Sequence, residues 1–413
     1  GLKDRDLMPV FPSGQHRRQR VGPALLVALL PIPLALLATT PARAVAEPSA
    51  PGQAATAATT DPAAQAQQGF GTDPKHDRPF DREGESLPLA FPTEGDPTAE
   101  TPSYPALELN GLIEGGWVRL DPFAGPPQSE WILYTFELML TLKPHPWVTA
   151  QVSADYEANG RAPPYLDVAH LLIGPPQGGW FIDAGQVYLP FGRYETHMVS
   201  DPLTLVLGET RDITTALGFE GTGLFGAAYA FSHQDLSGDT GKLDAWGAEL
   251  GYASRPGGQP RRLTLGYLSD LGNSDTLRYL VATGGQVGGL ACSALLEAGP
   301  WTFIGELVSA TRPFGPGAGP ALAGQSPAAW MLEVDYGFDF LGKEAQLALG
   351  YQGSAQALAL KLPQVRALVT FNLGIYQYTT LQLEWAQDQD YPQAEGGTGQ
   401  AGNGFTAQIA IEF

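Results

Sequence analysis

Between Ala106 and Phe413 the chain alternates apolar and polar residues with a period of two, in one run after another. The run 146–157 shows the pattern clearly. Its apolar residues are Val148, Ala150, Val152, Ala154 and Tyr156, and its polar residues are Thr149, Gln151, Ser153, Asp155 and Glu157. A helix would spread the polar residues around its circumference, whereas a strand places them all on one face. The pattern therefore predicts an all-β protein.

About sixteen runs of this kind can be counted. Most are long enough to cross the hydrocarbon layer of a membrane as tilted strands, which takes about 9–11 residues. The shortest run is 214–220. We expect strands at 106–119, 129–143, 146–157, 164–174, 179–189, 214–220, 223–233, 241–253, 261–270, 286–298, 301–311, 328–339, 343–353, 362–373, 376–388 and 403–413.

The connections between these runs alternate in length. Short turns, such as 143–146 and 299–300, alternate with longer loops, such as 271–285 and 312–327. Bacterial outer-membrane barrels have short periplasmic turns and longer outer loops. We therefore predict an antiparallel transmembrane β-barrel without a plug domain, with both of its ends on the periplasmic side. A soluble β-sandwich is the alternative, but sandwiches rarely have sixteen strands.

The longest connection, 190–213, is the third outer loop by strand order. Pro190 ends the preceding strand, and by analogy with sixteen-stranded porins we expect the loop to fold into the lumen. Mixed charges at such a constriction sort solutes by charge. Alternatively, these residues only form turns and pin the loop to the wall. The predicted constriction residues are Arg193, Glu195, His197, Asp201, Glu209, Arg211 and Asp212.

The alternation also predicts which strand residues face the lumen, and most of them are acidic. The main members are Glu137, Asp155, Asp183, Glu333, Asp335 and Arg366. An acidic lumen attracts cations and repels free polycarboxylates. The formal net charge of −20 argues against a nucleic-acid partner, because phosphate binding needs clustered Lys and Arg.

Two segments precede the predicted barrel at 106–413. A basic stretch ending at Arg20, the apolar stretch 21–37 and small-residue cleavage sites predict a Sec signal peptide over 1–46. Residues 47–105 are rich in Ala, Pro, Gln, Thr and acids and have no period, which predicts a disordered periplasmic linker. The chain is therefore expected in the bacterial outer membrane.

The chain ends on an alternating run that closes with Phe413. A terminal Phe after such a strand resembles the signal that the barrel-assembly machinery reads on outer-membrane barrels. We therefore expect this machinery and outer-membrane lipid as partners. A homotrimer is possible by analogy with many sixteen-stranded porins, although no residue pattern marks a trimer face.

The sequence offers little for catalysis or cofactor binding. Cys292 is the single cysteine, so neither an intramolecular disulfide nor a Cys-based metal site can form. The six His have no metal-ligand or triad spacing, and no Gly-rich phosphate loop follows a strand. We predict a protein that is not an enzyme and that has no metal and no cofactor.

The amino-acid sequence around the long loop resembles that of one protein family. The matching stretches are Leu189-Pro-Phe-Gly192, His197-Met-Val-Ser-Asp-Pro-Leu-Thr204, Leu207-Gly-Glu-Thr-Arg211, Leu217-Gly-Phe-Glu220 and, at the first strand, Leu109-Asn-Gly-Leu-Ile-Glu114. They are similar to the LbtU-type siderophore porins. The resemblance covers about 106–413 and implies an outer-membrane barrel that imports ferric siderophores. The helical N-terminal segment of some relatives has no counterpart in 47–105.

The acidic lumen is at odds with a polyanionic cargo. A ferric complex of an anionic siderophore would need local basic residues, for which Arg161, Arg193, Arg211 and Arg278 are the candidates. Two other functions therefore stay open. One is a general or cation-preferring porin without a siderophore role, and the other is a non-conducting structural or adhesive barrel.

Overall fold

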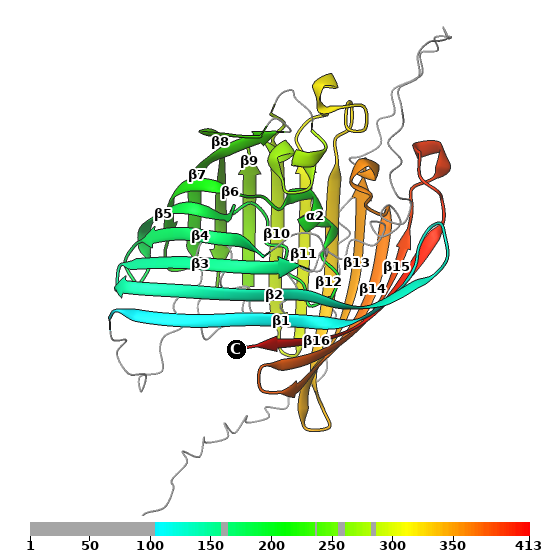
Figure 1. Ribbon diagram of the computed structural model, residues 1–413, viewed down its shortest axis with the longest axis horizontal. Helices are drawn as coiled ribbons and strands as arrows, with labels where there is room; N and C mark the ends of the chain where they lie inside the picture. The colour runs from blue at the N-terminus through cyan, green and yellow to red at the C-terminus, as the bar shows by residue number, and fades with distance from the viewer. Residues whose placement is uncertain (1–103, 158–163, 236–237, 255–260, 282–285) are drawn as a thin grey trace, which may run out of the picture. The chain divides into compact units, whose positions relative to one another are not determined.

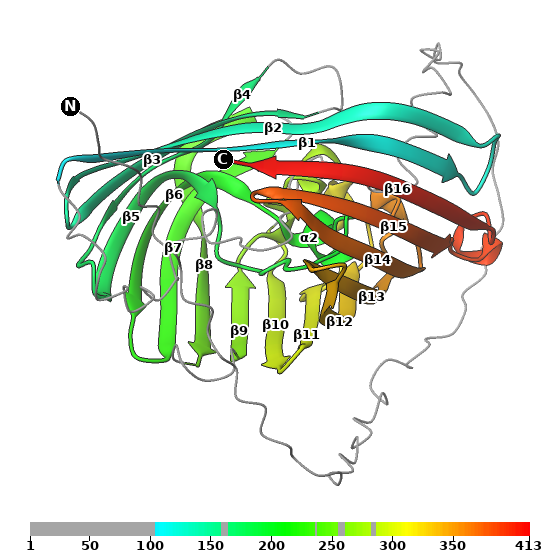
Figure 2. The same ribbon diagram turned by 90° about the horizontal axis from the view of Figure 1, so that it is seen from below.

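The computed structural model describes residues 104–157, 164–235, 238–254, 261–281 and 286–413. The predicted signal peptide and nearly all of the predicted linker lie outside the described residues. Sixteen antiparallel strands of the described chain form a closed barrel, in which β1 pairs with β16 (Figures 1 and 2). The strands are β1 Ala106–Asp121, β2 Gln128–His145, β3 Val148–Glu157, β4 Tyr165–Ile173, β5 Gly179–Tyr188, β6 Arg211–Glu220, β7 Leu224–Asp235, β8 Gly238–Ala253, β9 Arg261–Leu268, β10 Gly289–Ala298, β11 Trp301–Ala310, β12 Ala328–Phe340, β13 Lys343–Ala355, β14 Val365–Tyr376, β15 Thr379–Gln389 and β16 Ala401–Glu412.

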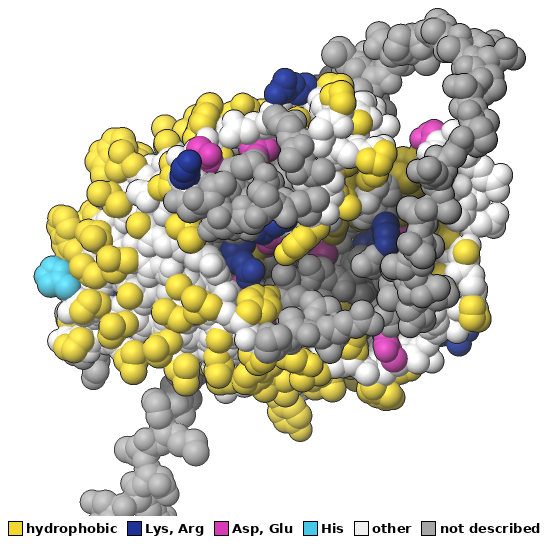
Figure 3. All heavy atoms as spheres, turned by 45° about the horizontal axis from the view of Figure 1, so that its top comes forward, with side chains coloured by type: hydrophobic (Ala, Val, Ile, Leu, Met, Phe, Trp, Pro, Cys, Tyr) yellow, Lys and Arg dark blue, Asp and Glu magenta, His cyan; other side chains and the backbone are white. Residues whose placement is uncertain are grey.

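The burial of side chains is the reverse of that in a soluble protein. On β2, Phe136 and Leu140 are exposed on the outer surface, whereas Glu137 and Thr141 are buried inside the barrel. Successive strand residues point to opposite faces, so the apolar residues of each run face outward and the polar residues face inward. Figure 3 shows hydrophobic side chains spread over the outer surface. Such an apolar outer face suits a barrel in lipid.

Aromatic side chains gather where strands meet the short turns. The rings of Trp180 and Phe219 lie 5.2 Å apart, and those of Trp301 and Tyr336 lie 4.7 Å apart, between centroids. Trp147, in the turn between β2 and β3, is 52% exposed. Aromatic rings prefer the headgroup level of a bilayer, so this end of the barrel has the girdle expected of a membrane protein.

The predicted barrel is confirmed, although many strand ends differ from the prediction by one to three residues. β6 begins at Arg211, opposite Tyr188 of β5. Arg211 and Asp212, which were expected in the third outer loop, are therefore strand residues. β7 and β8 likewise extend into most of the predicted loop 234–240. The strands continue there because backbone pairing does not depend on alternation of the side chains.

The structure has little helix. The α-helix α2 (Leu203–Gly208) lies inside the ring of strands and packs against β11, β12 and β13 (Figure 2). No helix within the described ranges is long and apolar enough to cross a membrane. No separate plug domain is present in the part of the chain that the structure describes. Short 3-10 helices lie in the connections, at η3 Leu271–Asn273, η4 Leu277–Tyr279, η5 Pro316–Ala318, η6 Leu358–Leu360 and η7 Gln393–Glu395.

The outward face of β13 provides a test of the membrane assignment. Leu349 lies near the middle of that strand and is 49% exposed. We expect Leu349→Arg to lower the free energy of unfolding from lipid vesicles by about 2–4 kcal/mol, because an arginine would lie near the bilayer midplane. Denaturant titration followed by tryptophan fluorescence measures this, with Leu349→Val as the control. An unchanged midpoint in the arginine variant would contradict the assignment of this face to lipid.

Candidate functional site

The connection between β5 and β6, residues 189–210, runs through the interior of the barrel, and we call it the inner loop. Its two ends are joined by a hydrogen bond of 2.8 Å from the N–H of Leu189 to the carbonyl of Thr210. Between its ends the loop contacts strands from β8 to β15. The prediction of a long third outer loop folded into the lumen is therefore confirmed.

Glu306 of β11 anchors the first part of the inner loop. Its carboxylate accepts the N–H of Arg193 at 2.6 Å, the N–H of Tyr194 at 3.2 Å and the hydroxyl of Thr204 at 2.7 Å. Glu306 is 5% exposed, so these charge-assisted hydrogen bonds form away from bulk water. A loop inside a barrel needs partners for its backbone N–H groups, and here a wall carboxylate supplies them.

Two more wall glutamates hold the next part of the loop. Glu333 of β12 accepts the hydroxyl of Thr196 at 2.6 Å and the N–H of His197 at 2.7 Å. Glu384 of β15 accepts the N–H of Val199 at 2.6 Å. Three strands thus present carboxylates to successive positions of the loop. The acids that face inward along the strands therefore fix the path of the loop backbone.

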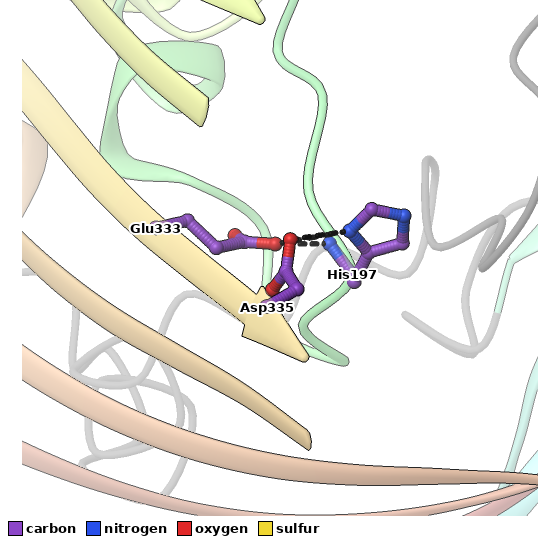
Figure 4. A group of neighbouring side chains, drawn as sticks. All are labelled: His197, Glu333 and Asp335. Carbon is purple, nitrogen blue, oxygen red and sulfur yellow. Dashed lines mark hydrogen bonds and ion pairs between the residues drawn. The ribbon is translucent and has the colours of Figure 1, made fainter. Parts of the chain in front are cut away.

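His197 faces two carboxylates at once (Figure 4). Its Nδ1 lies 2.9 Å from Oδ2 of Asp335 and 3.4 Å from Oε1 of Glu333. Burial alone lowers the pKa of His197, but the hydrogen bonds and charges of Asp335 and Glu333 outweigh burial and raise the pKa to about 10. The imidazole of His197 is therefore protonated at neutral pH.

The arginines next to the inner loop are paired with carboxylates. Arg193 pairs with Glu249 of β8 and lies over the ring of Phe225, 5.3 Å from its centroid. Glu195 of the loop pairs with Arg262 of β9. Both ion pairs join the loop to the wall. The positive charges are therefore compensated locally and leave little net positive potential for an anionic solute.

Three other arginines inside the barrel or in its long loops are paired in the same way: Arg211 with Asp167, Arg278 with Asp275, and Arg366 with Asp388. Arg366 is 1% exposed, and its two hydrogen bonds to Asp388 measure 2.8 and 2.9 Å. Arg161 lies outside the described residues. The described arginines named as possible anion ligands thus already have acidic partners.

Two of the predicted constriction residues, Glu195 and His197, keep access to solvent inside the barrel, whereas the side chain of Arg193 is nearly buried. Arg193, Glu195 and His197 alternate with the buried Tyr194 and Thr196. Their side chains are 7%, 21% and 19% exposed, in that order. The loop is therefore extended here, with one face against the wall and the other toward the interior space.

Three others are buried. Asp201 is 0% exposed and Glu209 is 6% exposed. Asp212 is 2% exposed and accepts hydrogen bonds from Nδ2 of Asn273 and the N–H of Ile213, both at 2.7 Å. These acids contribute to the packing of the loops. Arg211, at the first position of β6, keeps a side-chain exposure of 21%.

On the opposite side of the interior, β1 to β5 carry a second set of acids. Glu137 and Asp155 are direct partners in the register of β2 and β3, and both point inward. Asp183 of β5 lies 2.7 Å from Nδ1 of His170. Glu333, Asp335 and Arg366 also point inward, on the side where the inner loop lies. Within the described residues, the hydrogen bonds from inner-loop amides go to acids on that side.

Glycines on the wall let the inner loop lie flat against it. A Cβ on Gly266 of β9 would lie 2.1 Å from the carbonyl oxygen of Phe191. A Cβ on Gly350 of β13 would lie 2.8 Å from Cε of Met198. Sequence reasoning missed these positions, because a strand glycine carries no local sign of what packs on it.

A second feature that sequence reasoning missed is an apolar cluster formed by the inner loop, the other long connections and the adjoining strands. Leucines and a phenylalanine in segments expected to face solvent were the available signal. Burying them removes apolar surface from water and ties the long connections to one another. Members from the connections include Leu203, Leu207, Leu271, Leu277, Phe314, Leu322 and Leu360.

Removing the Glu306 carboxylate tests the anchor. We expect Glu306→Ala to loosen the first part of the inner loop at a cost of about 2–5 kcal/mol, because buried donors lose a charged acceptor. Larger current fluctuations in single-channel recordings would report the loosening. Glu306→Gln keeps one acceptor oxygen and serves as the matched control, with an intermediate effect. If the alanine variant shows the same current fluctuations as wild type, the loop is held by other contacts.

Filling the space at Gly266 tests the contact between loop and wall. Gly266→Val would force the backbone at Phe191 away from β9, because no room exists for a side chain. We expect a single-channel conductance different from wild type, together with faster protease cleavage in the loop. Gly337→Ala is the control, since its nearest neighbour would lie 3.7 Å away. Identical behaviour of the valine variant and wild type would refute the close packing.

A scan against protein-family models finds no match for this chain. Among known protein sequences it is similar to UPF0422 proteins. It is 28% identical to one from Coxiella burnetii over 319 residues, covering 72% of this chain and 67% of that protein. It is also 28% identical to one from Legionella pneumophila over 363 residues, covering 74% of this chain and 63% of that protein. The chain thus spans about two thirds of the length of these relatives.

Solved structures with the same architecture include an outer membrane channel and a porin. The outer membrane channel DcaP of Acinetobacter baumannii superposes with a TM-score of 0.55 at 14% identity, covering 76% of this chain and 99% of that one. OprB of Pseudomonas putida superposes with a TM-score of 0.55 at 10% identity, covering 74% of this chain and 94% of that one. An anion-selective porin from Comamonas acidovorans superposes with a TM-score of 0.53 at 12% identity, covering 75% of this chain and 99% of that one. The chain therefore has the fold of an outer-membrane porin barrel.

Proposed function

We propose that this protein is a channel of the bacterial outer membrane that lets small solutes diffuse through its barrel. The observation that carries the proposal is the inner loop, held across the interior by wall carboxylates while Glu195 and His197 keep access to solvent. A loop placed inside the barrel narrows the path, and its charges then act on each passing solute. We propose a channel rather than an enzyme, because solved structures with this fold include an outer membrane channel and a porin.

The charges favour cations over anions. The described arginines at the inner loop face carboxylates, whereas Glu137 and Asp155 add negative charge on the opposite side of the interior. We propose that Arg193, Glu195 and His197 line the path and that Asp201, Glu209 and Asp212 only hold the loops in place. The negative interior is expected to concentrate cations in the path.

The resemblance to LbtU-type siderophore porins adds a candidate substrate. Under this proposal the solute is a ferric siderophore, and the acidic interior restricts it to complexes that are neutral or cationic. A polyanionic complex would pass the same carboxylates at an electrostatic cost. The general cation-preferring porin is the second candidate, and it needs only the charge arrangement.

The route to the membrane is also proposed from the sequence. A Sec signal over 1–46 and a linker over 47–105 would precede the barrel, and the barrel-assembly machinery would read the terminal strand. Phe413 extends that strand by pairing with Gly111, with hydrogen bonds of 2.9 and 3.0 Å in the two directions. A homotrimer embedded in outer-membrane lipid is the proposed assembly, by analogy with other porins.

Planar-bilayer recording of the purified protein tests the channel. We expect discrete current steps and a reversal potential that reports cation preference. A unit charge about 7 Å from a passing ion contributes about 0.6 kcal/mol in water. The double variant Glu137→Gln, Asp155→Asn is therefore expected to lower the cation-to-anion ratio severalfold. Well-folded protein that gives no steps would leave a structural or adhesive barrel.

Uptake of iron-loaded siderophore by iron-starved cells tests the substrate. Cells with the protein are expected to take up a neutral or cationic complex faster than cells without it, and a polyanionic complex serves as the control. Equal uptake of the neutral complex in both strains would leave only the general porin.

A further inference from the structure

One imidazole and two carboxylates meet where the inner loop crosses β12. Glu333 and Asp335 stand at alternate positions of that strand, so both side chains point to the same inner face. His197 of the inner loop reaches both, and the three ligand atoms all lie within 4.8 Å of one another (Figure 4). The side chain of His197 is 19% exposed, so the cluster is reachable from the interior of the barrel.

The cluster has an excess of negative charge. Its two carboxylates are 2% and 1% exposed, and the single imidazolium balances only one of them. Arg193 and Arg366, on either side along the loop, already pair with Glu249 and Asp388. Hydrogen bonds from Thr196 and the N–H of His197 stabilise Glu333 without adding a formal positive charge, and a buried carboxylate without a cationic partner is costly. A divalent cation with a neutral imidazole would bring the charge of the cluster to zero.

A second observation points to the same three residues. Oδ1 of Asp335 has no hydrogen-bond partner among the described residues, although Asp335 is almost fully buried. Buried carboxylate oxygens are normally hydrogen-bonded or bound to a metal. Asp335 therefore offers one oxygen to the cluster and has a second, buried oxygen that accepts no hydrogen bond from the described residues.

The ligand atoms are already close to the spacing that a metal requires. Four ligands at about 2.0–2.1 Å around zinc lie about 3.3–3.4 Å from one another. Nδ1 of His197 is 2.9 and 3.4 Å from the two carboxylate oxygens, so small shifts suffice. Glu333 is held by Thr196, and the carbonyl of His197 accepts Nδ2 of Asn372 at 2.9 Å. Such supporting hydrogen bonds orient metal ligands.

We propose that His197, Glu333 and Asp335 bind a divalent transition-metal ion, such as zinc, that enters from the interior of the barrel. One nitrogen and two carboxylate oxygens suit zinc, nickel or cobalt, whereas magnesium and calcium prefer oxygen ligands alone. On binding, Nδ1 of His197 gives its proton to solvent and the lone pair goes to the metal, while waters complete the coordination. The ion ties the inner loop to β12.

Calorimetric titration of zinc into the folded full chain in detergent tests the binding, independently of any channel activity. We expect His197→Gln and Asp335→Asn each to weaken zinc binding about 10-fold or more. His170→Gln is the matched control, because His170 also lies 2.7 Å from a buried carboxylate but faces only one. A titration with magnesium in place of zinc is expected to give no heat of binding at this site. Circular dichroism verifies that each variant keeps its β-barrel.

Two results would overturn the proposal: no zinc binding by the wild-type chain, or equally tight binding by folded His197→Gln. A second measurement rests on the proposed channel function. Zinc should lower the cation current of the wild-type channel and of His170→Gln, but not that of His197→Gln, because a bound ion adds positive charge to the path. If folded protein forms no channel, the proposed function fails while calorimetry still decides the metal site.

Discussion

The structure depends on the hydrogen bonds between wall carboxylates and the backbone of the inner loop. Apart from α2, the inner loop has no regular secondary structure, and burying its N–H groups inside a barrel is costly unless partners are supplied. Glu306, Glu333 and Glu384 supply them from three strands. The amides stabilise the charge of these glutamates, so the loop and the acidic wall depend on each other.

This dependence changes the electrostatics of the interior. Acids that engage the loop amides have their charge partly compensated. Glu137 and Asp155 face the interior on the other side and lie opposite one another in the strand register. The arginines near the loop are paired with carboxylates as well, which removes the positive charge that an anionic cargo would need. The field in the path is therefore set by which charges the loop compensates, and the net charge of −20 alone does not predict it.

The loop also explains features outside the polar contacts. Gly266 and Gly350 leave room on the wall for the backbone at Phe191 and for the side chain of Met198. Leucines of α2 and the other long connections belong to one apolar cluster. Hydrogen bonds to wall carboxylates, close packing at wall glycines and the apolar cluster therefore all hold the inner loop. His197 stands where this segment crosses β12, facing two buried acids.

The sequence by itself determined the barrel, because alternation with a period of two is a local property that each strand displays on its own. It also located the inner loop, since alternation fails in only one such long stretch, and it named Arg193, Glu195 and His197 as candidates. It placed Arg211 and Asp212 in the loop wrongly, because backbone pairing with β5 carries β6 past the alternating run. Only the tertiary structure decided which acids bind loop amides and that Asp201, Glu209 and Asp212 are buried. Those outcomes depend on contacts between residues more than a hundred positions apart, such as Val199 with Glu384, and no local pattern records them.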